Sequence, residues 1–358
     1  NNASLMVPLG IGYIKTHAVH HLADQVDIKL FKSPEKLLSA AAAQEPDVIG
    51  FTNYGWNQHL NLTIGKYLRS QFPDALIVAG GPNIDPDPTL RLNFLNLHDY
   101  LDFTIVDSGE EPFTNLLIWW RDYKGNTSQL PQNILWKENG KLRQTTDLKQ
   151  LKQIDNIPSP YLSGHLDEFL DDGMVPLLET NRGCPFKCTF CAWGMASKDV
   201  VRRFPLETSL GEIEYIGRKS KARHWIIADA NFGILKRDVD IAQSIRAVKD
   251  QYGTPQTCDI WLAKNTTDRN LQIAAILGDM AIPVMAIQSM SPIVLEKIKR
   301  DNIRSTTYIE YQKKFHDQGN KTYSDLIVPL PGETLESHID GLKQMFEFGV
   351  DIIVSHSM

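Results

Sequence analysis

Long apolar runs are missing from this sequence. Stretches such as 48–51 and 75–79 have the length of a strand, whereas a helix that crosses a bilayer needs about 20 apolar residues. The start of the chain also lacks the pattern of a signal peptide. We therefore expect a cytoplasmic protein without membrane association. Because the chain begins at Asn1 and opens without a strand, we interpret it as a fragment that has lost its natural N-terminus.

Basic clusters and a disulfide framework are missing too. The 37 lysines and arginines are spread along the chain and are outnumbered by 43 acidic residues, so nucleic acid is not expected as a partner. Only four cysteines occur, and Cys258 stands apart from the other three. A secreted disulfide scaffold has more cysteines, whereas three clustered cysteines in a reducing compartment indicate a metal site. We interpret Cys258 as a buried core residue.

The length of 358 residues suits two domains of about 150 residues each. Residues 1–125 alternate short apolar strands with helices, which predicts a doubly wound, Rossmann-like α/β domain whose parallel sheet is covered on both faces. Strands are predicted at 26–31, 48–51, 75–79 and 103–106, and helices at 12–22, 34–43, 60–70 and 112–122. Open sheets of this type bind ligands beyond the carboxyl ends of their strands.

Residues 126–172 are polar and rich in turn signals, and we interpret them as a linker with a small hairpin across 134–143. A second α/β series covers residues 173–358. Its strands are predicted at 175–179, 224–228, 259–263, 284–288, 321–328 and 351–355, and its helices at 206–218, 238–251, 270–278, 293–300 and 335–348. This order indicates a partial (β/α)6 barrel with its reactive groups at the carboxyl ends of the strands. Because the sequence stops after the sixth strand, we expect the barrel domain to be truncated.

The three clustered cysteines follow the first predicted barrel strand. Cys184, Cys188 and Cys191 form a C-x3-C-x2-C pattern, and Gly183 and Pro185 favour a tight loop. Thiolates suit iron–sulfur clusters, and three of them leave one iron of a [4Fe–4S] cluster open to a small molecule. The alternative is zinc, which usually takes a fourth protein ligand at short spacing. Neither Cys nor His occurs within twenty residues downstream, which favours the cluster.

The pattern, with an aromatic Phe190 before the last cysteine, resembles the radical S-adenosylmethionine (SAM) superfamily over about residues 175–358. In that family SAM chelates the open iron, and an electron from the cluster cleaves it to methionine and a 5′-deoxyadenosyl radical. The resemblance implies an electron donor such as flavodoxin or ferredoxin. The SAM contacts that it implies are Phe190, Asp229, Asn231, Gln288, Ser289 and Pro331. Gln288 stands where many members have Glu, so the charge is lost. The alternative for Asp229 is a helix cap, and the turn at 332–334 could simply start a helix.

Three strand ends of the first domain resemble cobalamin-binding domains. In those domains a Ser/Thr strand end and a Gly-Gly turn admit the nucleotide tail of the cofactor, since glycine allows close approach. The implied cobalamin contacts are Thr52, Asn53, Tyr54, Gly55, Trp56, Gly80, Gly81, Pro82, Ser108, Gly109 and Glu110. Trp56 and Tyr54 could pack on the corrin ring or could simply be core aromatics.

The histidine motif that ligates cobalt in many cobalamin domains is absent. Residues 8–14, where it would fall, contain no His, and we interpret His17, His20 and His21 as helix-packing or surface residues. Either cobalamin binds without a histidine ligand, or the domain is an ordinary doubly wound domain that no longer binds it. We favour binding.

Together these resemblances imply a cobalamin-dependent radical SAM enzyme with three cofactors: a [4Fe–4S] cluster, SAM and cobalamin. We expect a methyltransferase that acts on an unactivated carbon of a small molecule or a peptide. One alternative is radical cyclisation or rearrangement without methyl transfer. The alternative from another class is a non-catalytic module that binds an iron–sulfur cluster and a corrinoid. Methylthiolation is disfavoured because its enzymes usually carry a second cysteine cluster.

Overall fold

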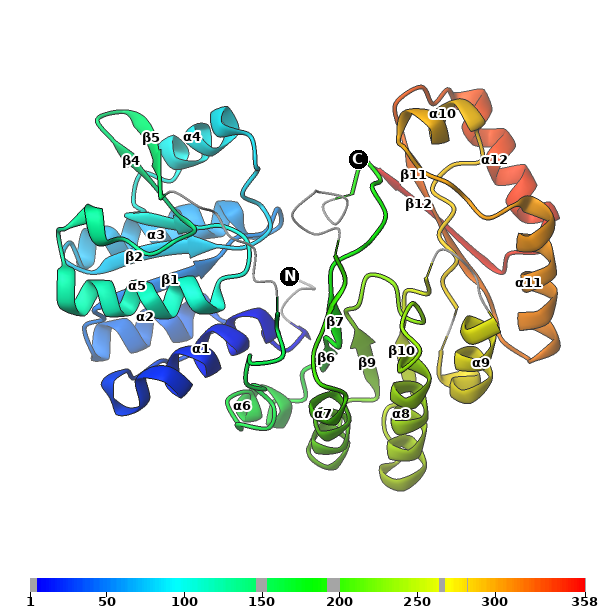
Figure 1. Ribbon diagram of the computed structural model, residues 1–358, viewed down its shortest axis with the longest axis horizontal. Coiled ribbons are helices and arrows are strands. Elements are labelled where there is room, and N and C mark those ends of the chain that lie inside the picture. Colours follow the sequence, from blue (N-terminus) through cyan, green and yellow to red (C-terminus); the bar gives the residue numbers. More distant parts are fainter. Residues whose placement is uncertain (1–4, 146–152, 192–199, 264–267, 282, 358) are drawn as a thin grey trace. The chain divides into compact units, whose positions relative to one another are not determined.

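The computed structural model describes residues 5–145, 153–191, 200–263, 268–281 and 283–357 (Figure 1). The chain forms two compact units. Unit 1 contains Pro8–Lys152 and Asn156–His165, and unit 2 contains Leu166–Met358 with the short segments Leu5–Val7 and Gln153–Asp155. Within the described residues, no helix combines the length and the apolarity needed to cross a membrane.

Unit 1 is built on a five-stranded sheet in the order β1-β2-β3-β4-β5 (Figure 1). The strands β1 (Val48–Thr52), β2 (Leu76–Gly80) and β3 (Phe103–Ile105) run parallel. Then β4 (Ile134–Glu138) and β5 (Lys141–Gln144) extend the sheet as an antiparallel hairpin. This hairpin lies within the segment that we expected to be a linker. It joins the sheet because the apolar start of β4 is fully buried beside β3.

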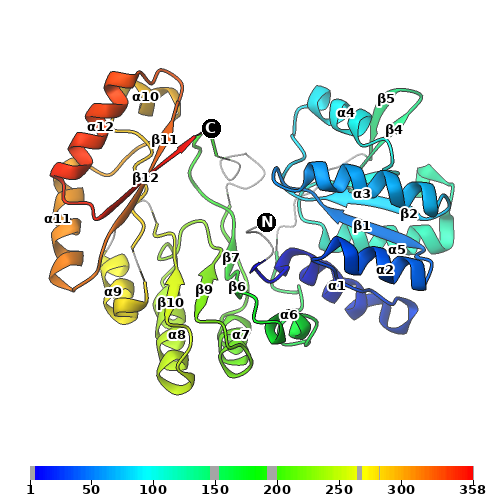
Figure 2. The ribbon, with the colours of Figure 1, turned by 180° about the vertical axis from the view of Figure 1, so that it is seen from behind.

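Helices cover both faces of this sheet (Figures 1 and 2). The helices of unit 1 are α1 (Leu9–Leu22), α2 (Pro34–Ala43), α3 (Gln58–Gln71), α4 (Pro88–Leu97) and α5 (Glu110–Tyr123). Successive residues of β2 point to opposite faces: Leu76 and Val78 pack on α5, whereas Ile77 packs on α2 and α3. Helix α1 packs on α5. The predicted doubly wound domain is confirmed.

Two local features of this unit differ from the sequence-based prediction. The strand predicted at 26–31 is irregular backbone, because its alternating side chains are only half buried and it pairs with none of the described strands. Helix α4 was not predicted. Asp87 caps its N-terminus by accepting hydrogen bonds from the N–H groups of Thr89 and Leu90, and Pro88 occupies its first turn.

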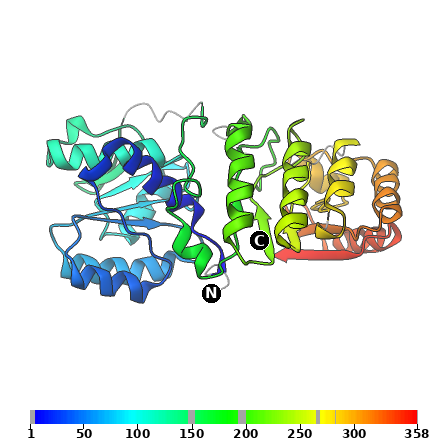
Figure 3. The same cartoon turned by 90° about the horizontal axis from the view of Figure 1, so that it is seen from below.

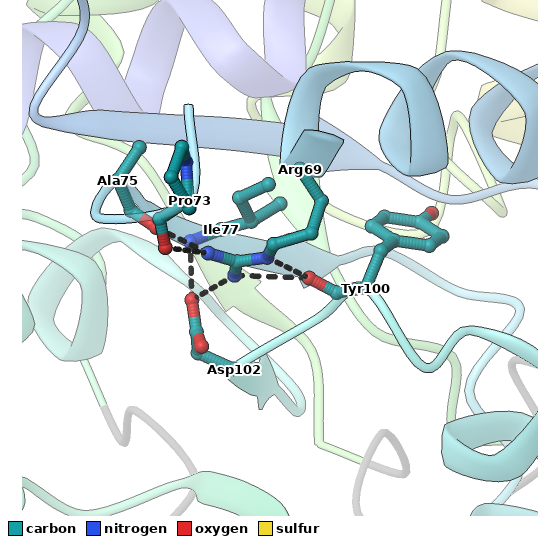
Figure 4. A network of polar contacts seen from close by, with 6 residues as sticks. All are labelled: Arg69, Pro73, Ala75, Ile77, Tyr100 and Asp102. Atoms are coloured by element: carbon teal, nitrogen blue, oxygen red, sulfur yellow. Dashed lines mark hydrogen bonds and ion pairs between the residues drawn. The ribbon is translucent and has the colours of Figure 1, made fainter. Parts of the chain in front are cut away.

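A polar network connects the amino-terminal ends of strands β2 and β3 to α3 (Figure 4). The guanidinium of Arg69 donates to the carbonyl oxygens of Pro73, Ala75 and Tyr100 and pairs with the carboxylate of Asp102. Asp102 also accepts a hydrogen bond from the N–H of Ile77 over 2.7 Å. One side chain thus joins the end of α3 to the beginnings of β2 and β3, at the edge opposite the predicted ligand site.

Unit 2 contains a parallel strand series. One sheet has the order β10-β9-β6, formed by Thr257–Asp259, His224–Ile227 and Leu177–Leu178, and a second pairs β11 (Tyr323–Val328) with β12 (Ile352–Ser357). Isolated parallel bridges at Ala281, Val284 and Gln288 connect the two sheets. The six predicted strands therefore follow one another in parallel, as expected for the partial barrel, with the fourth reduced to bridges. At the first predicted strand of this series, Met6 forms a parallel bridge with Val175.

Helices flank this series. They are α6 (Asp167–Asp171), α7 (Leu206–Lys219), α8 (Asp238–Tyr252), α9 (Asp268–Leu277), α10 (Pro292–Lys297), α11 (Ser305–Asp317) and α12 (Leu335–Glu347). Figure 3 shows α7, α8 and α9 side by side, and neighbours in this row are in contact. Helix α11 was not predicted, although its buried residues Tyr308, Tyr311 and Phe315 have helical spacing.

Candidate functional site

The cysteine loop follows β7 (Asn181–Arg182), which pairs with β8 (Arg202–Arg203). Cys184 and Cys188 are buried, Cys191 is half buried, and none of the three is in a disulfide within the described residues. The N–H of Thr189 donates to the carbonyl oxygen of Ile298 over 3.0 Å, which ties the loop to the end of α10. No three cysteine, histidine or carboxylate side chains in the described residues are placed to hold a single metal ion. Each cysteine of a four-iron cluster binds a different iron, so such convergence is not required.

Two buried polar side chains donate hydrogen bonds to the cysteine sulfurs. Asn231 Nδ2 lies 3.1 Å from Cys184 Sγ, and Arg300 Nη1 lies 3.8 Å from Cys188 Sγ. Both donors are almost fully buried. N–H donors and a positive charge beside sulfur stabilise thiolates and tune iron–sulfur centres. The donor set at this loop therefore fits an anionic iron–sulfur cluster. Asn231 was predicted as a SAM contact, whereas no role was predicted for Arg300.

Asp229, predicted as a SAM contact, uses both carboxylate oxygens inside the protein. Oδ1 accepts from the N–H of Thr180 over 2.7 Å and from the N–H of Asn181 over 3.2 Å. Oδ2 accepts from the Thr180 hydroxyl and from Asn181 Nδ2. Complete burial raises the pKa of Asp229 to about 7, and the hydrogen bonds from Thr180 and Asn181 oppose the rise. The described contacts of Asp229 therefore support β7, directly before the cysteines.

Gln288 and Ser289 lie together beside the loop after β11. Gln288 is buried with a backbone φ of 70°, and its Oε1 has no partner among the described residues. The Ser289 hydroxyl lies 3.4 Å from Glu333 Oε1, while Glu333 Oε2 is buried and has no partner in the described part of the chain. Two buried oxygen atoms without a described partner, Gln288 Oε1 and Glu333 Oε2, suit a ligand that carries N–H or O–H donors. Glu333 was quoted in the sequence analysis only as part of a turn.

The other two predicted SAM contacts are Phe190 and Pro331. Phe190 is half buried and packs against Val294, Ile298 and Leu330. Pro331 follows Leu330 and is exposed.

The predicted cobalamin edge of unit 1 is assembled by backbone hydrogen bonds. The N–H of Asn53 donates to the carbonyl oxygen of Gly80 over 2.6 Å, and the carbonyl oxygen of Asn53 accepts from the N–H of Asn83. The carbonyl oxygen of Thr52 accepts from the side chains of Asn57 and Asn61. Asn53 is 1% exposed, and its Nδ2 has no partner among the described residues. An unsatisfied donor at the end of β1 fits a ligand that carries acceptors, as the amide-rich rim of a corrin does.

An aromatic pair stands beside this edge. The rings of Tyr54 and Trp56 stack at 4.4 Å between centroids with 13° between planes, and Trp56 is 64% exposed. The core-packing alternative therefore does not apply to Trp56. Gly55, between them, has open space around it.

The two glycines of the turn, Gly80 and Gly81, differ in whether the fold leaves room for a Cβ. Gly81 has a φ of 115°, and a Cβ there would lie 2.7 Å from the carbonyl oxygen of Asn53, so the fold itself requires glycine. A Cβ on Gly80 would meet nothing closer than the carbonyl oxygen of Ile105 at 3.6 Å. Pro82, the third residue of this turn, is exposed.

The third strand end carries Ser108, Gly109 and Glu110. Ser108 is half buried, and Glu110 is buried in the first turn of α5. A Cβ on Gly109 would lie 2.9 Å from Ile14 Cδ1, so this glycine lets α1 approach the start of α5.

The histidines of α1 all lie in the second half of that helix. His17 Nδ1 is 2.7 Å from the hydroxyl of Thr114, one turn into α5, and its ring stacks on His21. Burial, together with the neighbouring His21, lowers the pKa of His17 to about 4. A neutral His17 that contacts Thr114 matches the predicted packing role.

Comparisons with known proteins agree with this two-part architecture. Residues 2–117 match the B12 binding domain, and residues 178–344 match the radical SAM superfamily. The cobalamin-dependent radical SAM methyltransferase TokK of Streptomyces tokunonensis is 32% identical over 359 residues, which cover 96% of this chain and 52% of TokK. The 2-(S-pantetheinyl)-carbapenam-3-carboxylate methyltransferase of Streptantibioticus cattleyicolor is 30% identical, with 97% of this chain and 52% of that enzyme covered.

A solved structure shows the same fold. The radical SAM methyltransferase TsrM from Kitasatospora setae superposes with a TM-score of 0.73 and 14% identity, covering 98% of this chain and 70% of that chain. The present chain spans about half the length of the two curated relatives above. The predicted combination of domains is confirmed: the chain is a radical SAM protein with an N-terminal B12 binding domain.

Proposed function

We propose that this chain forms the cofactor-binding part of a cobalamin-dependent radical SAM methyltransferase that acts on a carbon atom of a small molecule. The observation that carries the proposal is its similarity, over 96% and 97% of its length, to two methyltransferases. The cysteine loop of unit 2 and the polar strand ends of unit 1 support it, because each has the donor set that its cofactor requires.

Cys184, Cys188 and Cys191 would hold the [4Fe–4S] cluster. The hydrogen bonds from Asn231 and Arg300 favour anionic sulfur at this loop. When bound, the cluster and SAM would supply the radical chemistry at this loop, and cobalamin would supply the methyl group.

We propose that SAM lies along the carboxyl ends of the barrel strands. Phe190 and Pro331 would contact its adenine, and Gln288 and Ser289 its ribose or methionyl part. Glu333 would add the carboxylate that Gln288 lacks, because its buried Oε2 has no partner among the described residues. Asp229 would act through Asn181 and the cysteine loop, since its four hydrogen bonds are internal.

We propose that cobalamin binds at the carboxyl ends of β1, β2 and β3. The proposed contacts are Thr52, Asn53, Tyr54, Gly55, Trp56, Gly80, Gly81, Pro82, Ser108, Gly109 and Glu110. Asn53 Nδ2 offers a buried donor, and Trp56 an exposed aromatic face. Because His17 Nδ1 contacts the Thr114 hydroxyl and His21 Nδ1 contacts the carbonyl oxygen of His17, we propose that these two histidines would serve packing within α1 and α5 and would not ligate cobalt. We also propose that the β4–β5 hairpin belongs to this domain and that the barrel domain begins near residue 173.

We propose that the substrate is a small molecule, and that a pantetheinyl carbapenam is the first compound to test, because one relative carries that substrate in its name. A flavodoxin or ferredoxin in the cytoplasm would supply electrons.

Product analysis tests the proposal. The protein, reconstituted without oxygen, is incubated with SAM, a reductant and the candidate substrate. Formation of 5′-deoxyadenosine together with S-adenosylhomocysteine supports methyl transfer. Deoxyadenosine alone would favour the rearrangement alternative, and the absence of both would favour a non-catalytic binding module.

A further inference from the structure

Arg300 is a buried cation beside the cysteine loop. It is 6% exposed and follows α10. Its guanidinium donates to three partners: Nη1 to Cys188 Sγ over 3.8 Å, Nη2 to the carbonyl oxygen of Ala286, and Nε to Asn302 Oδ1 over 2.8 Å. The fork of an arginine side chain is needed to reach all three at once.

The groups that would balance this cation are the three cysteines. Burial lowers the pKa of Arg300, and Cys188, Cys191 and Cys184 oppose that shift. Arginine stays protonated in proteins, so a positive charge is held out of water at this place. A buried charge is costly unless an opposite charge pairs with it. Three thiolates that carry an iron–sulfur cluster provide that negative charge.

Asn302 connects Arg300 to the proposed SAM edge. Its Oδ1 accepts from Arg300, while its Nδ2 donates to the carbonyl oxygens of Ile287 over 3.0 Å and Ser289 over 2.9 Å. The backbone around the strained Gln288 is therefore held by the same network that reaches Cys188. A change at Arg300 acts on both the cysteine loop and this strand end.

We propose that Arg300 is a positioning residue that holds Cys188 and raises the reduction potential of the cluster. The proposal rests on the cluster assigned above to the three cysteines. One-electron reduction by an external donor adds a negative charge to the cluster and leaves the thiolate ligands in place. A fixed positive charge within hydrogen-bond reach of one ligand favours the more negative, reduced form.

Redox titration of the anaerobically reconstituted protein tests this role. Iron and sulfide are quantified first, and the reduced cluster is then followed by electron paramagnetic resonance across applied potentials. We expect a lower midpoint potential in Arg300→Gln and a smaller drop in Arg300→Lys, which keeps the charge but not the fork. Lys299→Gln is the matched control, because it removes the same charge from the exposed neighbouring side chain and should leave the potential unchanged.

Unfolding of the metal-free variants separates this role from a structural one. If Arg300→Gln loses iron, the proposal requires that Arg300→Lys retain it and that both apoproteins unfold near the wild-type urea midpoint. Apoproteins that are already unfolded in buffer would mean that Arg300 only supports the fold, and would overturn the proposal. A fully loaded Arg300→Gln protein with the wild-type potential would also overturn it. Failure of the wild-type protein to assemble any cluster would refute the cluster assignment as well.

Discussion

Replacing Asp229 by Asn tests whether this carboxylate supports the cysteine loop or binds SAM. The wild-type carboxylate accepts four hydrogen bonds from Thr180 and Asn181. An asparagine at this position keeps one oxygen for the two backbone N–H groups and presents an NH2 group to the other two donors. The Thr180 hydroxyl can turn away, so about one buried donor loses its acceptor, at a cost of about 1–3 kcal/mol.

Asp229→Leu is a more severe substitution at the same position, and its loss of stability is compared with that of Asp229→Asn. It has a similar shape and offers no acceptor, so the two backbone N–H groups and the Asn181 amide are all left buried without partners. The expected cost is about 4 kcal/mol or more, a large part of the stability of an average domain.

Urea unfolding of the metal-free proteins measures these costs, and iron release in air measures the effect on the loop. We expect Asp229→Asn to fold with reduced stability and to lose iron faster than wild type, and Asp229→Leu to be affected more. Wild-type stability and iron retention in Asp229→Asn, combined with loss of SAM binding, would refute this reasoning. That result would mean that Asp229 binds SAM directly.

Three further predictions follow from the contacts in each unit. Gly80→Val should abolish corrinoid binding and leave the iron–sulfur absorbance intact, because the added Cβ would meet nothing closer than 3.6 Å in the fold; an equimolar corrinoid in the variant would contradict the proposed edge. The folded pKa of His17, about 4, lies below its usual 6.5, so its contribution to stability is present above pH 6.5 and is lost as the pH falls toward 4. The difference in unfolding free energy between wild type and His17→Gln should therefore shrink over that range, and a difference independent of pH would argue against a neutral His17. Arg69→Met should lower the free energy of unfolding in urea by about 2 kcal/mol, because it removes the hydrogen bonds to the carbonyl groups and the ionic partner of Asp102, which keeps only the N–H of Ile77 among its described partners. The folded variant should still bind iron and corrinoid normally, and loss of either would show that this network also serves the site.

Hydrophobic pattern and cysteine spacing were enough to predict much of the fold. Strands β1 and β2 are continuous apolar runs, and burial on both faces requires such runs in a doubly wound sheet. The spacing of Cys184, Cys188 and Cys191 places three thiols in one loop, and the structure keeps that loop directly after β7.

Features set by distant contacts could not be read from the sequence. Arg300 ends a charged segment, Lys297–Arg300, that reads as a solvated helix end, and only folding brings its guanidinium to Cys188. Gly81 was interpreted as making room for a ligand, whereas the backbone of Asn53 already excludes a side chain there. The strand predicted at 26–31 alternates correctly but pairs with none of the described strands. For Arg300 and Gly81 the deciding neighbour is remote in sequence.

The most direct test of the central claim is the cofactor content of the protein reconstituted without oxygen. The account predicts about four irons and four sulfides per chain, charge-transfer absorbance near roughly 400 nm, and an equimolar corrinoid in the wild-type protein. In Cys188→Ala the iron–sulfur signal should be lost and the corrinoid retained, whereas Cys258→Ala should keep both. A full four-iron signal in Cys188→Ala, or an air-stable zinc ion in place of the cluster, would contradict the account.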